Sequence, residues 1–229
     1  MIKQALLILF YLLSNAADAT VLFTVNDRIQ SYEPPVRLSK ILEYNNNKDI
    51  YWPASQLFKR LDNSNLLNTF SDSLIEEQWT NAEKVAAMVS RWDVQQRIAI
   101  NVDLDLSRFN LEMNPLFNEG SYILRLSSRP KHVILIIDGE EQRVPYQNDW
   151  CEIAPLRSHL HNVEHHNDFI YSIDLAGTVS KIPVAYWNSR CSSIAPGITL
   201  FVPLYHPTLG FENKLNTIML SLLKHRVSQ

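Results

Sequence analysis

The chain has 229 residues, of which 46% are hydrophobic and 20% charged, a composition typical of one globular domain or two small ones. The acidic side chains, 24 in number, outnumber the 21 Lys and Arg side chains, so the formal net charge is −3 at pH 7. Nucleic-acid-binding domains usually have an excess of basic residues, which this chain lacks. With five glycines, it also has little material for a glycine-rich phosphate-binding loop. We therefore expect no nucleic-acid partner and no cofactor.

Residues 1–19 have the pattern of a secretory signal peptide. Lys3 precedes an apolar run over residues 5–13, and Ala17-Asp18-Ala19 is a typical cleavage site. The apolar run is shorter than the ~20 residues that cross a bilayer, which argues against an uncleaved anchor. We expect export with cleavage near Ala19 and a mature protein in the periplasm if the source is a Gram-negative bacterium.

The first unit, residues 20–127, is predicted to be a sheet with a short helix and an inserted helical hairpin at about 63–96. Segments rich in β-branched and aromatic residues favour strands, whereas apolar residues recurring every three or four positions favour helices. The expected strands are residues 21–25, 28–32, 50–52, 98–102 and 122–126. The expected helices lie around residues 38–42 and in the two halves of the insertion, the second starting at a capping box of Thr80 and Glu83.

The second unit, residues 128–204, repeats this order of hairpin, helix and strands. The dipeptide Asp138-Gly139 is a strong hairpin signal between the expected strands 133–137 and 142–144. A helix is expected over 148–159, followed by strands at 170–173, 179–184 and 200–204. Alternation of this kind favours an α+β fold with helices on one face of a sheet.

Residues 205–229 are predicted to be a tether and an amphipathic helix. The apolar residues of this helix fall at positions i, i+3, i+4, i+7 and i+8, which places them on one face. They are Leu215, Ile218, Met219, Leu222 and Leu223. We expect this face to dock on its own chain, with possible exchange to a second copy.

The most characteristic stretch of the sequence is Lys181-Ile182-Pro183-Val184-Ala185-Tyr186-Trp187-Asn188, followed by Arg190 and Pro196-Gly197. It closely resembles the last segment of the GfcC-like family of capsule biosynthesis proteins. Further residues match positions of that family in the same order. They are Trp52-Pro53, the strand 97–103, Asn114-Pro115, Tyr122 and Arg129-Pro130.

The resemblance implies a fold of two β-grasp domains, a helical hairpin inserted in the first and a C-terminal amphipathic helix. It also implies a periplasmic accessory role in the assembly or export of a capsular polysaccharide or exopolysaccharide. The protein would bind glycan or the outer-membrane polysaccharide export machinery. The alternative is a polysaccharide-modifying enzyme with a pocket around Arg97 and Asp103.

Three residues are candidates for the binding pocket. The guanidinium of Arg97 fits sugar hydroxyls, carboxylates and phosphates, although an ion pair with Asp103 or Glu76 would explain it equally well. Asp103 and Asp105 would share one face of the expected strand, as paired carboxylates or as solvated charges at its end. Trp52 would be a platform for a sugar ring or a half-buried core residue.

The sequence contains two further groups of reactive side chains. Cys151 and Cys191 are the only cysteines, and in an exported protein they form one disulfide or remain separate thiols. Four histidines lie between residues 159 and 166, but neighbouring His165 and His166 diverge and no supporting ligand can be named. We expect no metal site there.

Overall fold

The computed structural model describes residues 20–61, 64–76, 79, 81–147, 168–185, 187–188, 194–205, 208, 210–211 and 213–227. The predicted signal peptide, the predicted helix over 148–159, the histidine-rich stretch, Cys151 and Cys191 lie outside these residues. The choice between a disulfide and two separate thiols therefore stays open, and the expected absence of a metal at the histidines stays a prediction.

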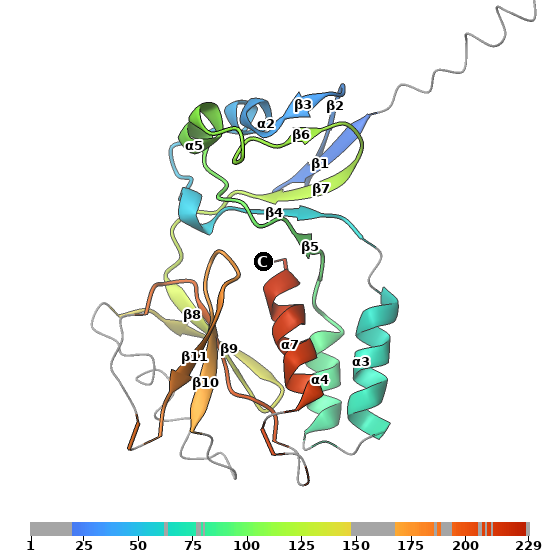
Figure 1. The fold of residues 1–229 in the computed structure, drawn as a ribbon, viewed down its shortest axis with the longest axis vertical. Helices are drawn as coiled ribbons and strands as arrows, with labels where there is room; N and C mark the ends of the chain where they lie inside the picture. Colours follow the sequence, from blue (N-terminus) through green and yellow to red (C-terminus); the bar gives the residue numbers. More distant parts are fainter. Residues whose placement is uncertain are drawn as a thin grey trace, which may run out of the picture.

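Two five-stranded sheets with the same strand order form the frame of the mixed α+β fold within the described residues (Figure 1). In each sheet an antiparallel hairpin lies at one edge, and the last strand in the sequence lies at the centre, parallel to the first strand. Two antiparallel strands complete the other side. The first sheet has the order β2-β1-β7-β4-β5 and the second the order β11-β10-β12-β8-β9.

The strands of the first sheet are β1 (Val21–Val25), β2 (Arg28–Tyr32), β4 (Gln56–Lys59), β5 (Gln96–Arg97) and β7 (Gly120–Arg125). Those of the second sheet are β8 (His132–Ile137), β9 (Glu140–Pro145), β10 (Phe169–Ile173), β11 (Val179–Pro183) and β12 (Thr199–Phe201). A small ladder joins β3 (Val36–Arg37) to β6 (Leu116–Phe117). The repeated order of hairpin, helix and strands that the sequence predicts is thus confirmed at the level of the sheets.

Both predicted hairpins are closed by two-residue turns with left-handed backbone. Asn26 and Asp27 have φ values of 43° and 69°, and Asp138 and Gly139 have values of 49° and 78°. Positive φ at both central residues is the geometry whose twist matches that of the flanking strands. Asn, Asp and Gly adopt it at the lowest cost, which explains why these turns could be predicted from the sequence.

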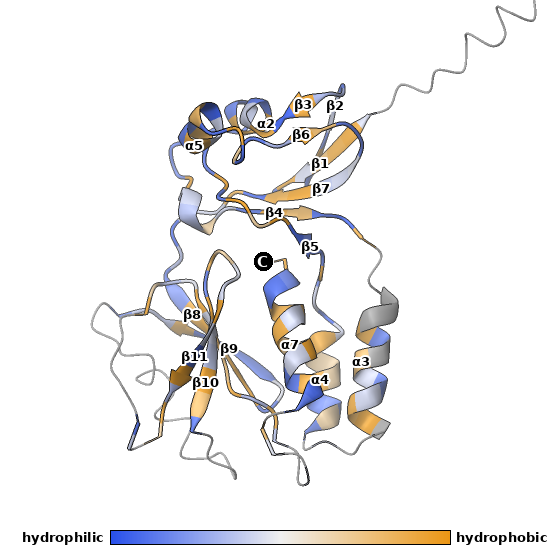
Figure 2. Cartoon of the chain, in the orientation of Figure 1, coloured by the Kyte–Doolittle hydropathy of each residue, from blue (hydrophilic) through white to orange (hydrophobic). Residues whose placement is uncertain are grey.

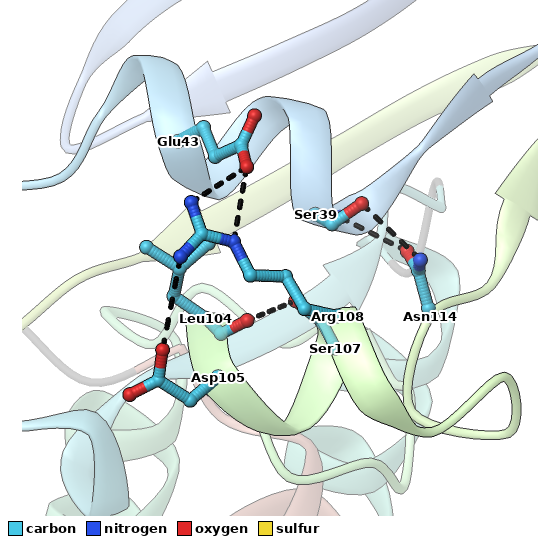
Figure 3. A network of polar contacts seen from close by, with 7 residues as sticks. All are labelled: Ser39, Glu43, Leu104, Asp105, Ser107, Arg108 and Asn114. Carbon is cyan, nitrogen blue, oxygen red and sulfur yellow. Dashed lines mark hydrogen bonds and ion pairs between the residues drawn. The ribbon is translucent and has the colours of Figure 1, made fainter.

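The core of the first sheet is covered by two short helices, α2 (Leu38–Tyr44) and α5 (Leu104–Phe109). α2 buries Leu38, Ile41 and Leu42 in the same cluster as Phe23 of β1. α5 is fixed to α2 by polar contacts that Figure 3 shows from close by. Arg108 donates to the Glu43 carboxylate at 2.7 and 3.0 Å, and the Asn114 side chain accepts from Ser39 N and donates to Ser39 Oγ.

The second sheet is covered by helices from two distant parts of the chain. These are the inserted hairpin of α3 (Ser64–Glu76) and α4 (Ala82–Val89), and the C-terminal helix α7 (Lys214–His225). One apolar cluster joins them to the sheet. Its members include Leu74, Val85, Met219, Ile136 and Phe201. The hairpin inserted in the first unit therefore packs on the second sheet, and Figure 2 shows mixed hydrophobic and hydrophilic residues along α4 and α7, as amphipathic helices require.

The predicted docking of the C-terminal helix on its own chain is confirmed. Leu215, Met219, Leu222 and Leu223 are all buried in the cluster that α7 forms with α3, α4 and the second sheet, and Ile218 packs against it. Asn216 is buried as well. Its side chain accepts from Leu204 N at 2.9 Å and donates to the carbonyl oxygens of Leu204 and Phe211.

Two predicted strands are wrong. Residues 50–52 do not form a strand, because the chain enters a short 3-10 helix, η1 (Trp52–Ala54), with Pro53 in its first turn, and the strand follows as β4. Residues 98–102 alternate in the expected way, but the strand β5 pairs with β4 over two residues and ends at Arg97. Ile98 and Ile100 are half-buried and pack against the core of the first sheet. Ile98 N still donates to the carbonyl oxygen of Leu57 in β4 at 2.9 Å, but the ladder does not continue beyond it.

Two helix starts also differ from the prediction. α4 begins after Asn81, whose φ is 59°, so the expected capping box of Thr80 and Glu83 does not form the N-cap. Asp103 and Asp105 lie at the start of α5 rather than on a strand.

The last predicted strand, 200–204, is shorter in the structure, since β12 ends at Phe201.

The turn between β8 and β9 supplies a test of how the inserted hairpin is held. A Cβ atom added at Gly139 would lie 2.6 Å from the backbone nitrogen of Val85 on α4. We expect Gly139→Ala to lower the free energy of unfolding by about 1–2 kcal/mol for the left-handed backbone and about 1–3 kcal/mol more for the steric conflict. Chemical denaturation would measure the loss.

Gly210→Ala is the matched control. Gly210 has a φ of 65°, and no atom lies within 4 Å of an added Cβ. It should lose the backbone part alone. Equal losses in the two variants would show that the contact between the turn and α4 adds nothing.

Candidate functional site

Trp52, Arg97 and Asp103, the three residues predicted for a pocket, line one cavity of about 480 Å³. We call it the joint cavity, because residues of two first-unit segments, 51–57 and 97–103, face Asp174, Leu175 and neighbouring residues of the second unit. It lies between the upper and lower sheets of Figure 1, where β4 and β5 approach the turn after β10. The sequence did not indicate that the second unit supplies one of its walls.

Arg97 extends from β5 to the second unit. Its Nη1 donates to the carbonyl oxygen of Leu175 at 2.8 Å, and its guanidinium carbon lies 5.3 Å from the centre of the Phe58 ring. Nε is buried without a hydrogen-bond partner in the described part of the chain. Burial lowers the pKa of Arg97 to about 10, an effect that the charge of Asp174 opposes, so the guanidinium is positive at pH 7.

The alternative predicted for Arg97, an ion pair with Asp103, is not found among the described residues, and the side chain of Glu76 lies outside them. Arg97 nevertheless has a structural role. Gly177 approaches so closely that an added Cβ would lie 3.0 Å from Arg97 Cδ. The side chain thus joins the two sheets and also forms a wall of the cavity.

Asp103 is the N-cap residue of α5. Its Oδ1 accepts a hydrogen bond from Leu106 N at 2.9 Å, which satisfies one of the free amides at the start of the helix. Asp105, the predicted second carboxylate, is exposed, lies 3.8 Å from Arg108 Nη1 and is not part of the cavity wall. The idea of an Asp103–Asp105 pair on one strand face is therefore wrong.

Trp52 is half-buried, as the second of its two predicted roles requires, whereas its role as a platform for a sugar ring stays a prediction. It packs against the apolar core of the first sheet and also lines the joint cavity. The short η1 helix turns it there, because Pro53 fixes the backbone directly after it. An indole held on one side by a core is a rigid surface for a ligand.

Several polar residues of the cavity were missed by sequence reasoning. Ser55 Oγ is buried without a hydrogen-bond partner among the described residues, and Gln56 Nε2 lies 3.4 Å from the Leu175 carbonyl oxygen. Asp174 accepts from Thr178 N through Oδ1 at 2.7 Å, which stabilises the turn after β10. The sequence after Asp174 indicates a turn, but no local pattern indicates that this turn contacts Arg97, more than 70 positions earlier.

The C-terminal end of α7 supports the edge of the site. Arg97 N donates to His225 Nδ1 at 3.0 Å, and Gln95 N donates to the carbonyl oxygen of His225 at 2.9 Å. One residue further, Val94 and Arg226 form an antiparallel bridge. The end of the chain thus fixes the strand that carries Arg97.

The described residues contain no group of three or more His, Cys, Asp or Glu side chains that could hold a metal ion. Across the same part of the chain, every helix is too short or too polar to span a membrane. The joint cavity instead offers one cation, carboxylates, amide and hydroxyl groups and an indole, which suit a polar ligand with a flat apolar face.

Residues 142–228 match the family model described as Capsule biosynthesis GfcC C-terminal. The matched segment contains β10, β11, β12 and α7, and so contributes Asp174, Leu175 and His225 to the site. Trp52, Arg97 and Asp103 lie outside it. No curated protein matches the chain.

The contact between Arg97 and His225 predicts a dependence of stability on pH. Burial lowers the pKa of His225, and Lys224 and Arg97 lower it further, against a hydrogen bond to the Gln95 backbone that raises it. The unfolded chain therefore takes up the proton first, so the free energy of unfolding should fall as the pH drops below about 6.5. Urea unfolding at pH 7.5 and 5.5 would measure this.

His225→Asn is the matched variant, because an amide oxygen can accept the Arg97 N–H bond without titrating. Its loss of stability between the two pH values should be smaller than that of the unchanged protein. The same loss in both proteins would contradict the role given to His225.

Proposed function

Because the chain belongs, through residues 142–228, to the GfcC-like capsule biosynthesis family, we propose that it is a periplasmic accessory protein that binds glycan during capsule assembly or export. The family name supports a role in capsule biosynthesis. The signal-peptide pattern of residues 1–19 supports the periplasm as its compartment. The joint cavity supports glycan as its ligand.

The two units are proposed to be β-grasp domains. The support is the strand order that both sheets share, with the last strand of each unit between the first and third main strands and parallel to the first. The boundaries proposed from the sequence, 20–127 and 128–204, fit the two sheets, with residues 205–229 as tether and helix. The inserted hairpin contributes its packing to the second unit.

The observation that carries the proposal is the convergence of Trp52, Arg97 and Asp103 on one cavity. An indole face packs well against the apolar face of a sugar ring, while a guanidinium and a carboxylate bind the hydroxyls at its edge. The carbonyl oxygen of Leu175 already accepts from Arg97, which holds the guanidinium in place before a ligand binds. Little ordering is then required on binding.

The alternative function, a polysaccharide-modifying enzyme, has one supporting observation. Asp103 and Asp174 both line the joint cavity, and enzymes that cleave glycosidic bonds use two carboxyl groups. Each carboxylate, however, accepts a hydrogen bond from a backbone amide at 2.9 or 2.7 Å, which suits a structural cap. We therefore favour binding over catalysis.

The polysaccharide export machinery of the outer membrane is the proposed protein partner. Self-association is a weaker proposal, because the apolar face of α7 is already buried within the chain. Exchange of α7 between copies would have to break the bonds of Asn216 to Leu204.

Export can be tested directly. In a capsule-producing host, we expect the protein to be released by gentle periplasmic extraction and to begin near Thr20 in mass spectrometry. Cleavage would leave no apolar leader on the mature chain. A cytosolic protein that retains Met1 would contradict the periplasmic role.

Asp103→Ser tests the glycan site without removing the helix cap, because serine is also a good N-cap residue. We expect glycan affinity to fall about tenfold, since one charge-assisted hydrogen bond is lost, and capsule output to fall with it. The melting temperature should stay near that of the unchanged protein. Calorimetric titration with oligosaccharides of the host capsule would measure the affinity.

Arg108→Gln is the control, because Arg108 pairs with Glu43 on the surface and does not line the cavity. It should leave binding and capsule output unchanged. Undiminished binding and capsule output in Asp103→Ser would refute the joint cavity as the glycan site. Cleavage of the oligosaccharides, abolished by Asp103→Ser, would favour the enzyme.

A further inference from the structure

We propose that a second cavity beside the joint cavity binds the acidic group, carboxylate or phosphate, of a charged glycan. This cavity of about 540 Å³ is here named the basic cavity, and Arg129, Lys131 and Arg143 lie in its wall. The inference rests on the proposed glycan-binding function and specifies its ligand as an acidic polymer. The two cavities share Gln56, Arg97, Asp174 and Leu175 in their walls.

The basic cavity concentrates positive charge in a protein whose formal net charge is −3. Five Arg and Lys side chains line it, whereas Asp174 is the one carboxylate among its lining residues within the described part of the chain. The cations are Arg97, Arg129, Lys131, Arg143 and Arg226. Like charges gathered in a cleft raise the local concentration of an oppositely charged ligand.

Three of these cations already have contacts within the protein. Arg226 forms an ion pair with Glu141 at 2.8 Å and lies over the Trp92 ring, and Arg97 donates to the Leu175 carbonyl. The guanidinium carbon of Arg129 lies 5.8 Å from the centre of the Tyr51 ring. Arg129, Lys131 and Arg143 have no ion pair with any residue that the structure describes. Their charges are available to a ligand.

The backbone that carries these side chains is held in place before a ligand binds. Arg129 and Lys131 belong to the linker between β7 and β8, where the Lys131 carbonyl oxygen accepts from Tyr146 N at 2.9 Å. The next carbonyl, that of His132, accepts from Gly197 N at 2.7 Å. A Cβ atom at Gly197 would lie 2.7 Å from Pro130 Cγ, so the loop before β12 presses directly on the linker.

The positive charge of the basic cavity also affects His132. His132 lines the basic cavity, and its pKa is lowered by burial and by the positive charge of Arg143. His132 is thus neutral at pH 7 and adds a polar ring to the wall rather than another charge. An anion bound beside it would oppose Arg143 and raise the pKa of His132.

The shared wall lets one ligand occupy both cavities. Ser127, Ser128 and Gln56 add hydroxyl and amide groups to the basic cavity, which suit the hydroxyls of the sugar that carries the acidic group. The next sugar would lie in the joint cavity near Trp52. Such an arrangement selects a polymer with repeated acidic groups over a neutral one.

The test is calorimetric titration at low salt with three probes, namely oligogalacturonate, oligomeric glycerol phosphate and neutral dextran oligosaccharide. The variant carries Arg129→Gln, Lys131→Gln and Arg143→Gln. The control of equal charge carries Lys40→Gln, Lys48→Gln and Lys214→Gln, three exposed lysines outside the cavity. We expect the unchanged protein to bind an acidic probe at least tenfold more tightly than dextran, the variant to lose that advantage and the control to keep it.

Preference for oligogalacturonate would assign the cavity to carboxylates, and preference for glycerol phosphate would assign it to phosphates. Acidic probes that bind no more tightly than dextran, or an equal loss in the control, would overturn the proposal. That failure is distinct from failure of the proposed function, which the Asp103→Ser variant decides with the capsule's own oligosaccharides.

A second measurement serves if the triple variant does not fold. In the unchanged protein, titration with the better acidic probe should raise the pKa of His132. NMR of the His132 ring protons would measure this pKa, and the His132→Gln variant would assign their signals. An unaltered pKa at saturating probe would overturn the proposal.

Discussion

Burial of the apolar faces of α3, α4 and α7 is the constraint on which the rest of this structure depends. Each of these helices is amphipathic, and none is long enough to be stable alone in water. They meet in one cluster with Ile136 and Phe201 of the second sheet. Because α3 and α4 lie in the sequence of the first unit, that unit supplies part of the cover for the second. The second unit therefore lacks a complete core without the hairpin of the first, whereas the core under α2 and α5 lies within the first unit.

The packing of α3, α4 and α7 on the second sheet also positions the joint cavity. Once α7 lies on the second sheet, its last turn reaches the edge of the first, where His225 accepts from Arg97 N. Val227 N donates to the Asp93 carbonyl oxygen at 2.8 Å and extends the contact. The wall between the two cavities is thus held in place by the packing of α7 on the second sheet, which lies away from the wall itself. A polar site needs such support, since its own hydrogen bonds contribute little net stability.

Most features that depend on neighbouring residues could be predicted from the sequence, although the capping box of Thr80 and Glu83 was a misleading local signal. Features that depend on distant residues could not be predicted. The Asp138-Gly139 turn and the apolar stripe of α7 are local signals, and both are confirmed. The alternation of residues 98–102 was a true sign of their burial, but a strand also needs a partner, and sequence periodicity does not supply one. For the same reason Arg97 and Trp52 could be singled out, whereas the wall formed by Asp174 and Leu175 could not.

The bridge between Val94 and Arg226 joins residues 132 positions apart in the chain. During synthesis, the segment before β5 therefore lacks this partner until residue 226 has been made, although β5 itself can already pair with β4. The loop that this contact closes has a high entropic cost, so it should form among the last steps of folding. A chain that stops before residue 226 could assemble much of the first sheet and still lack the contact that fixes this edge of the joint cavity. The joint cavity would thus be completed late in folding, after α7 has packed on the second sheet.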